Sequence, residues 1–191
     1  MNENNSRYKH FLQKINNGEI RLGSVPYEFR DYKLCLAAVK QNGMNLYNVP
    51  YKHKTYELCL EAVKLYGYSL LYVPEKHKTY NMCLQAVKNS GFAIDFTPDK
   101  HKTYELCLEA VKQNGRLLKF IPEDKKTYEM CLTAVDQIGS NLRYRMYTYE
   151  NQDIVCVDTI RYNKWILNYI PKKYIGKLFG VPRYKEIKLA A

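Results

Sequence analysis

The chain has 191 residues, of which 46% are hydrophobic and 26% charged, and 30 lysines and arginines against 19 acidic residues give a formal net charge of +11. This composition is typical of a folded protein and excludes a wholly disordered or collagen-like chain. No apolar run approaches the roughly 18 residues of a membrane-spanning helix, and the first ten residues lack the apolar stretch of a signal peptide. We therefore expect a cytoplasmic protein that does not bind membranes.

The sequence is organised by a repeat of 24 residues. A Cys-Leu pair, a glycine and a proline each recur five times with this spacing, and the cysteines are Cys35, Cys59, Cys83, Cys107 and Cys131. Such regular self-similarity indicates repeated supersecondary units. We divide the chain into an N-terminal cap (1–24), tandem repeats (25–146), and a degenerate repeat with a basic tail (147–191).

The first predicted element is half a repeat near the N-terminus, over residues 11–18, whose spacing to Pro26 is off by one. The end repeats of an array differ from the inner ones because one of their faces has no neighbour to cover it. We therefore predict that this segment caps the array.

Each repeat then contains a predicted amphipathic helix, as over residues 56–66. Leu58, Cys59 and Ala62 fall on one broad apolar arc when residues are placed at 100° intervals. Thr55 is the predicted N-cap, and Gly67 is predicted to supply a left-handed residue beyond the C-terminal end.

A short apolar stretch follows, as over residues 68–73, and ends before the next proline. A short helix would place Leu70 and Val73 on one face, whereas a strand would align Leu70 with Tyr72. We favour the helix, which predicts an all-α fold: an α-solenoid of about five helix-turn-helix repeats with degenerate caps at both ends. A helix-strand solenoid is the alternative.

The pattern Cys-Leu-x-Ala-Val-Lys-x-x-Gly, which is clearest at residues 107–115, resembles a family of short tandem repeats described only as a domain of unknown function. The resemblance covers about residues 19–146 and implies an all-helical array. It implies no activity, cofactor or catalytic residue.

The repeated cysteines and histidines do not predict a catalytic or metal site. Equivalent positions on stacked helices lie about 8–10 Å apart, which is too far for a disulfide or for shared zinc ligands. The cysteines lie on the apolar arc, whereas His53, His77 and His101 precede the helix. We therefore expect reduced cysteines packed between helices, no cofactor, no small-molecule substrate and no enzymatic activity.

The strongest binding candidates are the basic loops that precede the helices. They share one edge of four successive repeats and contain Lys52, His53, Lys54, Lys76, His77, Lys78, Lys100, His101, Lys102, Lys125 and Lys126. We expect a non-enzymatic scaffold that binds a macromolecular partner, an acidic protein surface, as an adaptor or an occluding inhibitor. The alternative is binding of a nucleic-acid backbone along this edge.

The tyrosines fall into two groups. Tyr56 and its equivalents begin each helix on the apolar arc and are predicted to pack in the core. Tyrosines at positions that vary between repeats, including Tyr68 and Tyr72, are predicted to contact the partner. The basic tail beyond residue 171 either docks as a cap or is a mobile arm.

Overall fold

The computed structural model describes residues 3–143 and 164–179. The chain forms two compact units, residues 1–101 (the N-terminal unit) and residues 102–191 (the C-terminal unit). No helix within the described ranges combines the length and the apolar character needed to cross a membrane.

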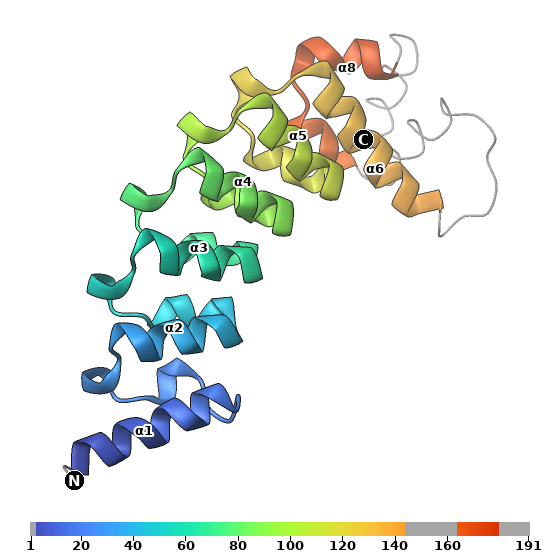
Figure 1. Ribbon diagram of the computed structural model, residues 1–191. Coiled ribbons are helices and arrows are strands. Elements are labelled where there is room, and N and C mark those ends of the chain that lie inside the picture. The colour runs from blue at the N-terminus through green and yellow to red at the C-terminus, as the bar shows by residue number, and fades with distance from the viewer. Residues whose placement is uncertain (1–2, 144–163, 180–191) are drawn as a thin grey trace. The chain divides into compact units, whose positions relative to one another are not determined.

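Two kinds of helix alternate along the chain (Figure 1). The α-helices are α1 (Glu3–Asn16), α2 (Tyr32–Gln41), α3 (Tyr56–Leu65), α4 (Tyr80–Asn89), α5 (Tyr104–Gln113), α6 (Tyr128–Arg143) and α8 (Lys172–Phe179). The six-residue 3₁₀-helices are η3 (Gly43–Asn48), η5 (Gly67–Tyr72), η7 (Gly91–Phe96), η9 (Gly115–Phe120) and η11 (Lys164–Tyr169). The three-residue 3₁₀ turns are η1 (Leu22–Ser24), η2 (Tyr27–Phe29), η4 (Tyr51–His53), η6 (Glu75–His77), η8 (Asp99–His101) and η10 (Glu123–Lys125).

Each α-helix of the repeats begins after a side chain that caps it. Thr55 Oγ1 accepts a hydrogen bond from the Leu58 amide at 3.3 Å, and Asp31 Oδ1 accepts one from the Leu34 amide at 2.8 Å. The same cap recurs at Thr79, Thr103 and Thr127. The predicted N-cap is confirmed, because a side-chain oxygen satisfies one of the free amides of the first turn.

The second element of the repeat is helical, but it is a 3₁₀-helix. Leu70 within η5 and Val73, which caps its C-terminal end with an extended backbone, are both buried. The helix-strand alternative is wrong, since no strand occurs in the described residues. The chain is an all-α solenoid of 24-residue repeats, as predicted.

The predicted role of the repeated glycine is wrong. Among the described glycines only Gly18 has a positive φ, of 72°, so Gly67 is not a left-handed helix end. Instead Gly67 begins η5, and a Cβ at this position would overlap the carbonyl oxygen of Ala86 in the following repeat. The same overlap would occur between Gly43 and Ala62, and between Gly115 and Ala134. Glycine is required at these three positions because two backbones approach closely there.

Within the N-terminal unit, successive repeats pack side by side. The helices α1 to α4 contact one another in sequence order, and η3, η5 and η7 form a second row that packs against them. The α-helix of each repeat buries a leucine or methionine, a cysteine, an alanine and a valine, which in α3 are Leu58, Cys59, Ala62 and Val63. The predicted apolar arc is therefore the seam between repeats.

In the C-terminal unit, the last described helix is docked on the preceding repeat. Helix α8 packs against α6 and η11 packs against η9, and Ile166, Ile170 and Ile175 are buried there. The Tyr174 ring lies 6.0 Å from the Tyr128 ring, over which Lys177 Nζ lies at 4.2 Å. The tail thus docks as far as residue 179. Cys156 of the predicted degenerate repeat lies outside the described residues, as do Arg183, Lys185 and Lys188 of the basic tail.

Candidate partner-binding surface

The predicted basic loops are short 3₁₀ turns that begin after a proline. In η4 the His53 amide donates to the Pro50 carbonyl at 2.9 Å, and the Lys54 amide donates to the Tyr51 carbonyl at 3.1 Å. These bonds fold the turn tightly, so that its two lysines have different surroundings. Lys52 is exposed, whereas Lys54 is half-buried.

The second lysine of each turn is a structural residue. We call Lys54, Lys78, Lys102 and Lys126 the inner lysines. Lys54 Nζ donates to the Tyr72 carbonyl at 3.0 Å, and Lys102 Nζ donates to the Phe120 carbonyl at 3.0 Å. Both carbonyls belong to the last residue of a 3₁₀-helix, where no helical amide is available.

Burial excludes three of these amines from partner contact. Lys78, Lys102 and Lys126 are only 7–8% exposed. Lys78 Nζ lies 2.6 Å from a Glu75 carboxylate oxygen, and Lys126 Nζ lies 2.9 Å from one of Glu123. The prediction that they form part of a surface stripe is wrong, because a long side chain can bury its stem and still satisfy its amine locally.

Lys54 is also engaged, although it is less buried. Desolvation lowers the pKa of its amine, and the nearby Cys59 thiol opposes that shift. Arg30 stands at the same repeat position, and its guanidinium donates to the Val25, Asn48 and Gly23 carbonyls at 2.8, 3.1 and 3.2 Å. At this repeat position Arg30, Lys54 and Lys102 thus each donate to the carbonyl of the last residue of a 3₁₀-helix.

The first lysine of each turn is available to a partner. We call Lys52, Lys76 and Lys100 the outer lysines; all three are exposed and belong to the N-terminal unit. Lys52 and Lys100 form no hydrogen bond or ion pair with any described residue, and Lys76 Nζ lies 5.6 Å from the centre of the Tyr51 ring. Lys125, in the C-terminal unit, is half-buried.

The three histidines of these turns are half-buried. The His77 ring lies 6.4 Å from the Tyr56 ring at the start of α3, in an edge-on arrangement. His53 and His101 occupy the same place in η4 and η8. The histidines therefore lie between the outer and inner lysines and keep part of their rings accessible.

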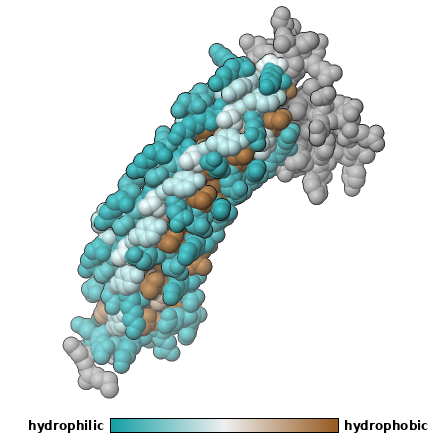
Figure 2. All heavy atoms as spheres, turned by 45° about the horizontal axis from the view of Figure 1, so that its top comes forward, coloured by the Kyte–Doolittle hydropathy of each residue, from teal (hydrophilic) through white to brown (hydrophobic). Residues whose placement is uncertain are grey.

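An exposed tyrosine directly follows the proline in two of the turns, and one of them, Tyr51, lies beside the outer Lys76. Tyr27 and Tyr51 follow the prolines of η2 and η4 and are 62% and 68% exposed. Neither Tyr27 nor Tyr51 was predicted to contact a partner, although their position directly after a proline, where the chain turns outward, could have indicated it. On the face in Figure 2, apolar groups lie among a mainly hydrophilic surface.

The two tyrosines predicted to contact a partner are half-buried and paired. The Tyr72 ring lies 5.1 Å from the Tyr47 ring, and the Tyr68 ring lies 4.8 Å from the Phe96 ring, both edge-on. Tyr47 itself is 65% exposed. By contrast, the tyrosines that begin the helices are not core residues throughout, since Tyr80 and Tyr104 are 37% and 39% exposed.

The cysteines are buried at the repeat seams. Cys35, Cys59, Cys83, Cys107 and Cys131 are free thiols with no exposed surface. Burial raises the pKa of Cys35, Cys59 and Cys131 to about 11, so they are protonated at neutral pH. Within the part of the chain that is described, no three His, Cys, Asp or Glu side chains converge as metal ligands do.

Four overlapping segments of the chain match DUF4116, a domain of unknown function: residues 31–78, 55–102, 79–124 and 103–146. The chain belongs to the DUF4116 family. The four DUF4116 matches begin at the N-cap residues Asp31, Thr55, Thr79 and Thr103, and each spans about two repeats. No curated protein and no solved structure matches the chain.

Proposed function

We propose that this DUF4116 protein is a non-enzymatic scaffold whose repeats bind a protein with an acidic surface. The observation that carries the proposal is the repetition of an exposed, unsatisfied cation on successive turns of the N-terminal unit. Lys52 and Lys100 have no partner among the described residues, and Lys76 lies beside the exposed Tyr51. The half-buried His53, His77 and His101 of the same unit complete the proposed contact set.

The mixed character of the turns favours a protein over nucleic acid as the partner. Exposed carboxylates of Glu75 and Asp99 occur beside the outer lysines and weaken a purely cationic edge. Exposed tyrosines are typical of protein interfaces, which favour aromatic residues at their centres. A phosphate backbone would instead be expected to require a continuous run of cations.

The chemistry of the thiols supports a binding role rather than catalysis. A cysteine nucleophile acts as the thiolate and needs a lowered pKa and access to substrate. Cys59 has the opposite properties, since it is fully buried and its pKa is raised to about 11. These free thiols also fit the cytoplasmic location that we propose, because reducing compartments keep cysteines unpaired.

Affinity capture tests the proposal directly. The full chain serves as bait in an extract of the native host, with and without nuclease treatment. We expect a protein to be retained after nuclease treatment and released by moderate salt. Loss of all capture after nuclease treatment, together with a linear fall of log affinity with log salt, would establish nucleic-acid binding instead.

A further inference from the structure

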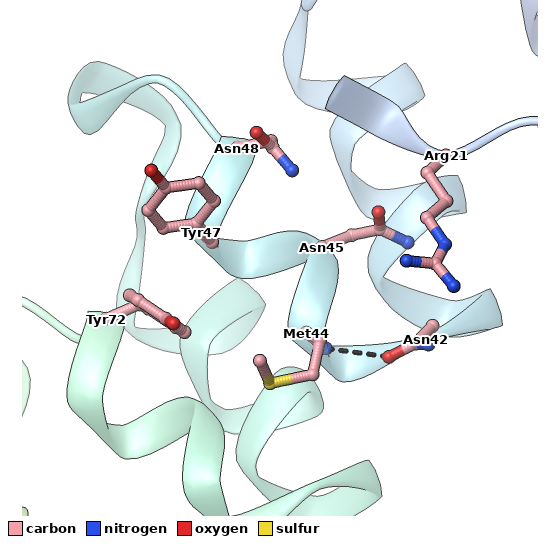
Figure 3. A pocket seen from close by; sticks show the side chains of 7 residues that line it. All are labelled: Arg21, Asn42, Met44, Asn45, Tyr47, Asn48 and Tyr72. Carbon is pink, nitrogen blue, oxygen red and sulfur yellow. Dashed lines mark hydrogen bonds between the residues drawn. The ribbon is translucent and has the colours of Figure 1, made fainter. Parts of the chain in front are cut away.

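The N-terminal unit contains a small hollow that the repeat pattern does not predict. Its volume is about 190 Å³, and it is lined by Arg21, Asn42, Met44, Asn45, Tyr47, Asn48 and Tyr72 (Figure 3). Most of the lining comes from η3 and the residue before it, and Tyr72 ends η5 of the next repeat. The hollow therefore joins the N-terminal cap to the first two regular repeats.

One side of the hollow carries a cation without a counter-ion. Arg21 is exposed, and its guanidinium forms no hydrogen bond or ion pair with a described residue. No aspartate or glutamate belongs to the lining. A guanidinium presents a planar fork of N–H donors, which fits a carboxylate by two parallel hydrogen bonds.

The floor of the hollow is fixed by a buried amide. Asn45 Oδ1 accepts from the Leu22 amide at 3.2 Å, and its Nδ2 donates to the Ala38 carbonyl at 2.8 Å. Asn42 Oδ1 is also occupied, because it accepts from the Met44 amide at 2.9 Å. The two Asn45 bonds hold η3 against α2 and Leu22, so that the floor of the hollow is fixed before a ligand arrives.

The opposite side is aromatic. The rings of Tyr47 and Tyr72 meet edge-on at 5.1 Å, and their hydroxyls have no partner among the described residues. Figure 3 places these rings across the hollow from Arg21, with Met44 and Asn45 between them. One face can thus cover an apolar group while the other binds an anion.

The size of the hollow restricts the class of ligand. Pockets for small molecules and cofactors usually measure about 300–1,000 Å³, whereas this hollow measures about 190 Å³. It suits one side chain of a partner. We propose that it receives an Asp or Glu side chain of the acidic partner, with the carboxylate on Arg21 and the neighbouring apolar residue of that segment against Tyr47 and Tyr72. This inference rests on the proposed function and names one point of contact for it.

Selection from a random peptide library displayed on phage tests the proposal. The full chain is the bait, and we expect enrichment of peptides in which Asp or Glu adjoins an apolar or aromatic residue. An enriched peptide is then synthesised together with its carboxylate-to-amide variant. Each is measured against the wild-type chain, Arg21→Gln and the control Lys33→Gln, which removes an equal charge from an exposed site on α2.

The test depends on whether the loss of the peptide carboxylate and the loss of Arg21 have coupled effects on binding. Removing the carboxylate should weaken binding to the wild-type chain and to Lys33→Gln at least tenfold, and should weaken binding to Arg21→Gln less than twofold. Equal losses on all three proteins would overturn the assignment of the carboxylate to Arg21 while leaving acidic recognition by the repeats intact. Failure to enrich acidic peptides would overturn this inference alone if protein capture from extract still depends on the outer lysines.

One further measurement distinguishes a nucleic-acid ligand from a peptide carboxylate. A labelled single-stranded oligonucleotide is titrated against the wild-type chain and Arg21→Gln. We expect no dependence of its binding on Arg21. An oligonucleotide affinity that falls tenfold in Arg21→Gln would show that the hollow binds phosphate, and the proposal of a peptide carboxylate would be wrong.

Discussion

Two lysines separated by a single residue have opposite roles in each turn. Lys54 donates its amine to the Tyr72 carbonyl 18 residues further along the chain, whereas Lys52 points into solvent. A hydrogen bond from a charged donor contributes about 1.5–3 kcal/mol, and the carbonyl that loses its donor remains unsatisfied. Desolvation, which lowers the pKa of the Lys54 amine, offsets part of this contribution.

Exchange of each lysine for methionine separates these roles, because methionine keeps an unbranched stem and removes the amine. We expect Lys54→Met to lower the free energy of unfolding by about 1–2 kcal/mol. Lys52→Met should change it by less than about 0.5 kcal/mol, as surface substitutions usually do. Urea denaturation at pH 7 measures both values, and equal stabilities would refute the structural role of the inner lysine.

The buried thiols should be chemically inert in the native protein. Because Cys156 lies outside the described residues, the measurement uses a Cys156→Ser background, in which the other five cysteines are all buried. We expect no reaction with a thiol reagent at pH 7 under native conditions, and reaction of five thiols after denaturation. Rapid modification of the folded chain would contradict the burial of these side chains at the seams.

The same thiols predict a loss of stability at high pH. The pKa of Cys59 is about 11 in the fold against an ordinary value of 9.0, so between these values the unfolded chain releases a proton that the folded chain retains. The free energy of unfolding therefore falls as the pH rises from 9 to 11. Cys59→Ala should show a shallower fall over this interval in chemical denaturation; identical slopes would disprove the contribution of Cys59.

At the scale of the element, Gly67→Ala distinguishes two effects of the seam glycine on stability, because backbone entropy and the close approach of the next repeat predict changes of opposite sign. Gly67 does not have a positive φ, so backbone entropy alone predicts that alanine stabilises the fold by about 0.4–1 kcal/mol. The close approach of Ala86 predicts the opposite, a loss of about 1–3 kcal/mol, because the two backbones must separate. Thermal unfolding of Gly67→Ala decides, and a raised melting temperature would contradict the close seam.

Much of the secondary structure could be predicted because it depends on residues that are close together in the sequence. The cap at Thr55 and the apolar arc of α3 lie within one helix and are visible in the sequence. The role of Gly67 was misjudged because the atom that requires it belongs to the next repeat. The inner lysines were misjudged because their partner is distant in sequence: Lys52 and Lys54 look alike until the carbonyl of Tyr72, 18 residues further along, is placed beside one of them.

The candidate site could be predicted only in outline. The repeat pattern correctly located the basic turns, and it could not separate exposed from buried amines. The hollow beside Arg21 was not predictable, because it combines residues from the N-terminal cap and two repeats that come together only in the fold. Tyr72 was identified, but its packing against Tyr47 depends on the stacking of η3 on η5.

At the scale of the whole molecule, the two lysine positions separate assembly from recognition. The inner position is used within repeats of both units, and the outer lysines present charge on the N-terminal unit. Substitution of the outer lysines should therefore abolish partner binding without destabilising the fold.

The most direct test is the capture of partner by a triple variant, Lys52→Gln with Lys76→Gln and Lys100→Gln. The matched control is Lys40→Gln with Lys64→Gln and Lys88→Gln, which removes the same charge from exposed sites in the last turns of α2, α3 and α4. We predict that the first variant melts like the wild-type protein and captures at least tenfold less partner, while the control captures normally. Undiminished capture by the outer-lysine variant, or an equal loss in both variants, would contradict the account.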